Sequence, residues 1–245
     1  MKILALLQAR NEERYLRGWL ENVAPAVDGS VALDDGSTDG TREILAAHPK
    51  LRALLTNPAG HAWNEYANQV GLLKAGRLHD ATWFLCLDAD ERLEERLVNS
   101  IRPILLEAER RGVDALALQL RELWDDRRQY RADGDWGTRA RYRLFRNLPN
   151  QNKFDPRRLH RHWMPLELVA NLKTAGAHLP YAIYHLRMIR PADREARYRR
   201  YLALDPGSRY QQQGYKHMID ESGLELAPVT PDRDFLPRDE VALAD

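Results

Sequence analysis

The sequence has little of three features that would each point to a particular class of protein. It has one cysteine, Cys86, among 245 residues, which excludes an intrachain disulfide and favours a reducing, cytoplasmic setting. It has no apolar run near the roughly 18 residues that a membrane-spanning helix needs, so only peripheral contact with a membrane stays open. Its net charge is +1, which gives no reason to expect a nucleic-acid partner.

Apolar runs alternate with helical patterns through the first half of the chain, which is typical of βαβ units that build a mostly parallel sheet. Residues 3–7 are too short an apolar stretch for a signal peptide and are expected to form a buried first strand. Further strands are expected at 31–33, 51–55, 82–87, 115–120 and 139–146, and helices at 13–24, 38–48, 61–76, 93–111 with an interruption at Pro103, and 192–204. The pattern predicts an α/β fold with a Rossmann-like central sheet and flanking helices.

Two acidic clusters directly follow apolar runs. Residues 34–41 read Asp-Asp-Gly-Ser-Thr-Asp-Gly-Thr, and residues 88–91 read Asp-Ala-Asp-Glu. An open α/β sheet binds its ligand at the carboxyl ends of its strands, and two carboxylates at i and i+2 of an extended strand point the same way. Asp88 and Asp90 could therefore share one divalent cation. Helix and turn capping is the alternative explanation of each cluster, but the two together favour a nucleotide diphosphate with its metal.

The chain becomes basic after this half. Residues 121–161 carry eleven Arg and one Lys against six Asp or Glu. In the strand expected at 139–146 arginine alternates with other residues, which predicts one arginine-rich face. A basic lobe beside an acidic metal site suits a phosphate-bearing ligand, and a solvated basic surface is the alternative.

Three segments in a fixed order carry a resemblance to a known family. They are Gln8-Ala9-Arg10-Asn11-Glu12, the cluster at 34–41, and Leu87-Asp88-Ala89-Asp90-Glu91. The sequence resembles family 2 glycosyltransferases with the GT-A fold, most strongly over residues 1–120. The resemblance implies an inverting, metal-dependent transfer of a hexosyl or related sugar from a nucleotide-diphosphate sugar to a hydroxyl acceptor, with Mg²⁺ or Mn²⁺ as the cofactor.

The resemblance also implies roles for single residues. The nucleotide pocket would be lined by Gln8, Arg10 and Glu12, the base and ribose would meet Asp34 or Asp35, the segment Asp88-Ala89 would lie near ribose and metal, and Asp90 would ligate the metal. Many members of the family have Pro and an aromatic residue where this chain has Gln8 and Arg10, which leaves the identity of the base open.

For two further roles, the third metal ligand and the general base, the sequence offers more than one candidate residue. A histidine from a late strand completes the metal site in several proteins of this fold, and His185 fits that pattern better than His178, with an ordinary buried histidine as the alternative. An inverting transfer needs a general base, usually a carboxylate. The candidates are Asp155, His160, His162 and Glu167, of which Glu167 and His162 are favoured, although spacing alone does not decide.

The expected organisation is a nucleotide-sugar-binding domain at 1–120, an acceptor-side lobe at 121–205 and an extended C-terminal tail at 206–245. Two other functions fit parts of the sequence. A sugar-phosphate nucleotidyltransferase would have a glycine-rich loop after the first strand, and residues 8–13 contain no glycine. A non-catalytic nucleotide- or polyanion-binding module would use the basic half, but acidic strand ends repel phosphates unless a cation is present.

Overall fold

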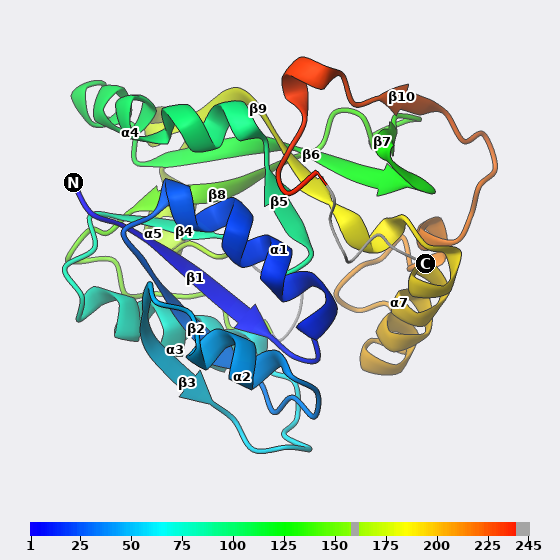
Figure 1. Cartoon of the computed structure of the whole chain (residues 1–245), viewed down its shortest axis with the longest axis horizontal. Coiled ribbons are helices and arrows are strands. Elements are labelled where there is room, and N and C mark those ends of the chain that lie inside the picture. The colour runs from blue at the N-terminus through cyan, green and yellow to red at the C-terminus, as the bar shows by residue number, and fades with distance from the viewer. Residues whose placement is uncertain (158–161, 239–245) are drawn as a thin grey trace.

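The computed structural model describes residues 1–157 and 162–238, and a ten-stranded mixed sheet forms its centre (Figure 1). The strands are β1 (Ile3–Ala9), β2 (Gly29–Asp34), β3 (Leu51–Thr56), β4 (Trp83–Cys86), β5 (Glu91–Leu93), β6 (Ala115–Trp124), β7 (Asp126–Arg131), β8 (Ala140–Arg146), β9 (Gly176–His185) and β10 (Leu226–Pro228). Their order is β10-β7-β6-β8-β4-β1-β2-β3, and β9 pairs with both β6 and β5.

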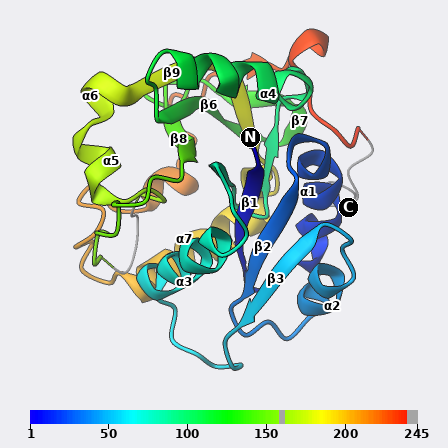
Figure 2. The same cartoon turned by 90° about the vertical axis from the view of Figure 1, so that its left-hand side faces the viewer.

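The strands β3, β2, β1 and β4 are parallel to their neighbours, as the βαβ pattern predicts. Both faces of β1 are buried, so alternate residues enter different cores: Ile3 and Leu7 pack on one side, Leu4 and Leu6 on the other. The first side is covered by α1 (Glu13–Val23), α2 (Thr41–Ala46) and α4 (Glu95–Arg110), and the second by α3 (Glu65–Arg77), α5 (Leu166–Ala170) and α6 (Leu172–Ala175), as Figure 2 shows. The predicted α/β class with a Rossmann-like sheet is confirmed.

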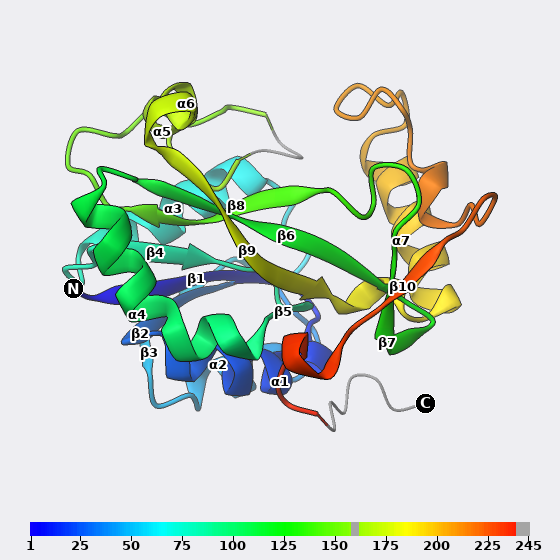
Figure 3. The same ribbon diagram turned by 90° about the horizontal axis from the view of Figure 1, so that it is seen from above.

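The second half of the chain extends the same sheet. Strand β8 lies antiparallel between β4 and β6, and β9 runs parallel to β6 (Figure 3). These pairings bring the arginine-rich strand β8 beside the end of β4, from which the second acidic cluster follows. The domain boundary predicted at residue 120 falls within β6, and the division of the chain at 120 and 205 stays a prediction.

The helices and tail differ from expectation in two places. Helix α4 continues through Pro103, although the sequence predicts an interruption there. Pro103 lies on the exposed face of α4, where water can replace the backbone hydrogen bond that proline removes. The tail after α7 (Pro191–Leu204) contains short 3₁₀ turns and β10, which pairs with β7. No helix in the described ranges is long and apolar enough to cross a bilayer.

Candidate active site

A pocket of about 440 Å³ opens where β1 and β4 end, and charged side chains line much of its wall. The arginines of the wall come from both halves of the chain: Arg10, Arg141, Arg143, Arg187, Arg197 and Arg200. An equal number of carboxylates line it, from Glu12 near β1 to Glu122 on β6. The pocket therefore combines the acidic and basic regions that the sequence analysis singles out separately.

Asp88 lies on the turn that follows β4. The N–H of Glu91 donates to the carbonyl oxygen of Asp88 over 3.0 Å, so Asp88 and Asp90 stand on a turn, not on an extended strand as expected. The Asp88 side chain is 50% exposed and accepts a hydrogen bond of 3.1 Å from Arg143. Arg143 also pairs with Glu91, and these two side chains are only 9% and 3% exposed. Arg143 thus fixes the turn and leaves part of the Asp88 carboxylate open to the pocket.

Asp90 is buried among cationic side chains. Its Oδ2 accepts from Nε of Arg187 over 2.5 Å and lies 3.1 Å from Nε2 of His185. Arg187, which follows β9, also pairs with Glu12, so it ties the first motif to the third. Burial alone would raise the pKa of Asp90, but Arg187 and His185 hold it well below its usual value. The carboxylate is ionised and surrounded by positive charge.

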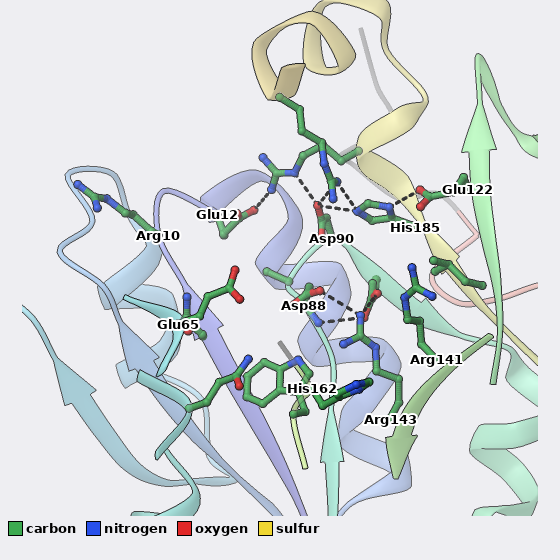
Figure 4. Close-up of a pocket in the computed structure, with 18 of the residues that line it drawn as sticks. Arg10, Glu12, Glu65, Asp88, Asp90, Glu122, Arg141, Arg143, His162 and His185 are labelled. Atoms are coloured by element: carbon green, nitrogen blue, oxygen red, sulfur yellow. Dashed lines mark hydrogen bonds and ion pairs between the residues drawn. The ribbon is translucent and has the colours of Figure 1, made fainter. Parts of the chain in front are cut away.

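His185 stands at the end of β9, where the parallel register with β6 pairs it with Glu122. Its Nδ1 meets the Glu122 carboxylate, and its Nε2 lies 2.8 Å from Nη1 of Arg197. Figure 4 shows Asp90, His185 and Glu122 in a row across the pocket. Nε2 also lies 3.1 Å from Oδ2 of Asp90, so it faces a donor and an acceptor at once. A ring protonated on Nε2 donates to Asp90, and a ring without that proton accepts from Arg197.

A second proton on His185 would compete with Arg197 for the same nitrogen. Burial lowers the pKa of His185, whereas Glu122 and Asp90 raise it, to about 10 overall. The position beside Nε2 and Asp90 therefore attracts positive charge strongly, and the guanidinium of Arg197 lies next to it. A proton, a guanidinium and a metal ion therefore compete for the position beside Nε2 of His185 and Oδ2 of Asp90.

The donor set at this place suits a hard divalent cation. Among residues 1–157 and 162–238, no group of three or more His, Cys, Asp or Glu side chains is arranged to hold a metal ion. Mg²⁺, however, commonly uses one or two carboxylates and takes its other ligands from water and substrate phosphates. Asp90 and His185 converge, and Glu122 orients the imidazole from behind, as carboxylates do for metal-bound histidines. The residues present fit the cation that the sequence motif implies.

The two aspartates of the first acidic cluster have different surroundings. Asp34 accepts a hydrogen bond from the N–H of Ser37, so it caps the turn. Asp35 is fully buried and accepts 2.6 Å from the side chain of Asn57, which in turn donates to Asn68. Oδ2 of Asp35 accepts no hydrogen bond from the described residues and lies 3.9 Å from Nη1 of Arg10.

The end of the pocket near Asp35 contains further polar atoms without partners. Gln8 and Gln69 line the pocket, and Oε1 of each is buried and accepts no hydrogen bond within the described part of the chain. Buried polar groups in folded proteins are nearly always hydrogen-bonded, so such atoms indicate a polar ligand. Glu12, Asp88, Ala89 and Asp90 line the pocket as well. Arg10 does so too, whereas Asp34 and Asp35 lie behind its wall.

The structure shows which of the candidate general bases line the pocket. His162 lines the pocket (Figure 4). Glu167 is not among the pocket-lining residues, because its carboxylate accepts the backbone N–H groups of Asn152 and Lys153 and so caps their loop. Asp155 is bound by Arg157 outside the pocket, and His160 lies outside the described residues.

Several residues of the pocket carry no signal in the sequence. Glu122, Arg187 and Arg197 each look like ordinary surface charges, because what brings them together is the pairing of β6 with β9 and the position of α7. A basic residue two places after the predicted ligand His185 is the one local hint, since Arg187 reaches the same carboxylate.

Comparison with known sequences does not identify a family for this chain. No family model matches the chain. Two curated proteins match, an uncharacterized protein of Mycobacterium bovis and one of Mycobacterium tuberculosis, each 28% identical over 220 residues. The alignment takes in 86% of this chain and 52% of each relative, so the chain spans about half the length of the curated relatives that it matches.

Comparison with solved structures identifies the fold. Residues 1–349 of TarS from S. aureus match with a TM-score of 0.50 and 14% identity, over 90% of this chain and 70% of that chain. A mannosyltransferase from Pyrobaculum calidifontis, solved in complex with GDP-Man and Mn²⁺, matches with a TM-score of 0.50 and 17% identity, over 83% of this chain and 61% of that chain. The chain has the GT-A fold, as the resemblance of its motifs implies.

Proposed function

We propose that this chain is a glycosyltransferase that moves a sugar from a nucleotide-diphosphate sugar to a hydroxyl acceptor. One observation carries the proposal: the first and third motifs line a single pocket, where Arg187 bridges Glu12 to Asp90. The second motif lies directly behind the wall of this pocket, with Asp35 3.9 Å from Arg10. The GT-A fold supports it, because its solved examples include a mannosyltransferase in complex with GDP-Man. The base, the sugar and the acceptor are left open.

The nucleotide end of the donor would occupy the pocket beside β1. Gln8 and Gln69 present unpartnered amide oxygens there, and Asp35 presents an unpartnered carboxylate oxygen behind Arg10. Base N–H and ribose O–H groups are the complementary donors. Asn57 donates to Asp35 over 2.6 Å and to Asn68 over 3.0 Å, so Asp35 is held in place before a ligand arrives.

The diphosphate would lie between the acidic turn and the arginines. Asp90, His185 and the open oxygen of Asp88 would hold Mg²⁺ or Mn²⁺, which when bound neutralises the charge that the departing diphosphate acquires. Arg141 and Arg200 also line the pocket, and neither forms a salt bridge with a carboxylate of the described residues. Their guanidinium groups are available to a phosphate.

The reaction would invert the configuration of the sugar. The acceptor hydroxyl attacks the anomeric carbon from the face opposite the diphosphate, forming the new C–O bond as the bond to the phosphate oxygen breaks. The hydroxyl proton passes to a general base, and His162 is our candidate because it is the predicted base that lines the pocket. The diphosphate leaves with the bonding electron pair.

A thermal-shift experiment tests this proposal. Nucleoside diphosphates should raise the melting temperature of the full chain in the presence of Mn²⁺, because a ligand that binds only the folded state stabilises it by mass action. Asp90→Asn removes the carboxylate charge but keeps the shape, and it should abolish the metal-dependent part of the shift. Arg199→Gln on the exposed side of α7 is the control and should behave like the wild type. A wild-type protein that no nucleoside diphosphate stabilises, with or without metal, would contradict the proposal.

A further inference from the structure

The guanidinium of Arg197 stands where a divalent cation would have to stand. Nη1 of Arg197 lies 2.8 Å from Nε2 of His185 and 4.0 Å from Oδ2 of Asp90. Asp90 and His185 are the two groups that converge best on a metal position, and their facing atoms are 3.1 Å apart. The Arg197 side chain is 23% exposed, so it reaches this place from the pocket side.

Two cations cannot share this position. A metal ligated by His185 needs the Nε2 lone pair, and Nη1 of Arg197 lies 2.8 Å from that nitrogen. A divalent ion beside Asp90 would also face the full charge of Arg197 at close range in a poorly solvated site. Arg187 cannot make room in the same way, because Glu12 and Asp90 hold it from both sides. Arg197 is the cation that has to move.

Helix α7 gives Arg197 another place to go. Arg197, Arg200 and Tyr201 all line the pocket, and the spacings i, i+3 and i+4 place them on one face of the helix. Arg197 pairs with no second carboxylate besides Asp90 among the described residues. A diphosphate in the pocket would offer its guanidinium a new anionic partner when the metal takes the old one.

We propose that Arg197 is a placeholder for the divalent cation: it occupies the Asp90–His185 position in the donor-free protein and leaves it when metal and donor diphosphate bind together. This inference rests on the proposed function. Arg197 in this position keeps metal binding weak until the donor is present, so that the metal and the donor diphosphate bind cooperatively. Because coupling between two ligands is reciprocal, the metal must strengthen diphosphate binding by the same factor.

Titration of the full chain with Mn²⁺, followed by the EPR signal of free Mn²⁺, tests the inference without an activity assay. Arg197→Gln removes the competing charge and should tighten Mn²⁺ binding to the donor-free protein about tenfold, within the usual range of coupling between sites. Arg197→Lys keeps the charge and should bind Mn²⁺ as weakly as the wild type. Arg199→Gln removes the same charge from the exposed side of α7, where Arg199 pairs with Glu195, and should change nothing.

The same titration in the presence of GDP or UDP separates this inference from the proposed function. The wild type should bind Mn²⁺ much more tightly with the matching diphosphate, and the gain should be smaller in Arg197→Gln. If Mn²⁺ binds with a diphosphate but Arg197→Gln is no tighter without one, the placeholder role is refuted and the metal site stands. If the wild type binds no Mn²⁺ under any condition, both fail. Should Arg197→Gln melt early, Arg197→Met, which keeps the apolar stem, provides the same comparison.

Discussion

Replacing Arg143 by methionine should destabilise the protein in a way that depends on pH. Arg143 is buried with Glu91 and forms its ion pair there, while its other contact, Asp88, is half exposed. Burial raises the pKa of Glu91 to about 7 even though Arg143 lowers it, so removing Arg143 should raise that pKa further. Breaking a buried ion pair by removing one partner costs about 3 to 5 kcal/mol.

The sign of the pH effect follows from the raised pKa. A group whose pKa is higher in the folded state, about 7 for Glu91 against 4.5 in the unfolded chain, stabilises the fold fully below 4.5, and this contribution is lost as pH rises through 7. At pH 5 Glu91 is already neutral in the wild type, so Arg143→Met should cost little. At pH 8.5 the wild type has an ionised pair and the variant has a buried acid without its partner, so the full cost should be seen.

Thermal denaturation at pH 5 and at pH 8.5 measures this difference. At pH 8.5 the melting temperature of Arg143→Met should fall by about 6 to 20 °C, since each kcal/mol shifts it by about 2 to 4 °C at this chain length. Arg141→Met, two residues away on β8, is the matched control and should stay within about 0.5 kcal/mol of the wild type, because Arg141 is exposed and has no ion pair among the described residues. An equal loss at both pH values would refute the role assigned to Glu91.

Three further predictions concern the chemistry. His162→Gln should lower kcat by about 10² to 10⁴ with donor binding unchanged by calorimetry, as expected for a general base, whereas Glu167→Gln, outside the pocket, should retain activity. Glu122→Gln should weaken Mn²⁺ binding about 10- to 100-fold in the presence of nucleoside diphosphate, measured by EPR, because it removes the carboxylate that orients His185; unchanged affinity would show that His185 is no ligand. Chromatography of the reaction products should show a nucleoside diphosphate, and released pyrophosphate would instead indicate nucleotidyl transfer.

The sequence predicts the parallel half of the fold well, because its signals are local. Strands β1, β2 and β4 are short apolar runs that are buried on both faces, so they can be recognised without an alternating pattern. Strand β3 lies at the edge of the sheet and is only partly buried. The missed elements are those whose structure depends on distant partners. Strand β5 is only three residues long and exists because it pairs with β9, and β7 is rich in charged residues that pair with β10.

The site was predictable up to the acidic motifs and no further. Asp88, Asp90 and Glu12 line one pocket because the carboxyl ends of β1 and β4 are neighbours, which the βαβ pattern implies. The arginines around them were expected only as a basic region. Arg187 and Arg197 reach Asp90 because of the turn after β9 and the packing of α7. No local sequence pattern predicts either feature.

Crystals of the full chain grown with Mn²⁺ and the nucleoside diphosphate that stabilises it would test the central claim most directly. An anomalous difference map should place Mn²⁺ within about 2.0 to 2.3 Å of Nε2 of His185 and a carboxylate oxygen of Asp90, with its remaining ligands from diphosphate and water. A nucleotide bound in the pocket with its phosphates held by arginines alone, and no anomalous peak between Asp90 and His185, would contradict the account.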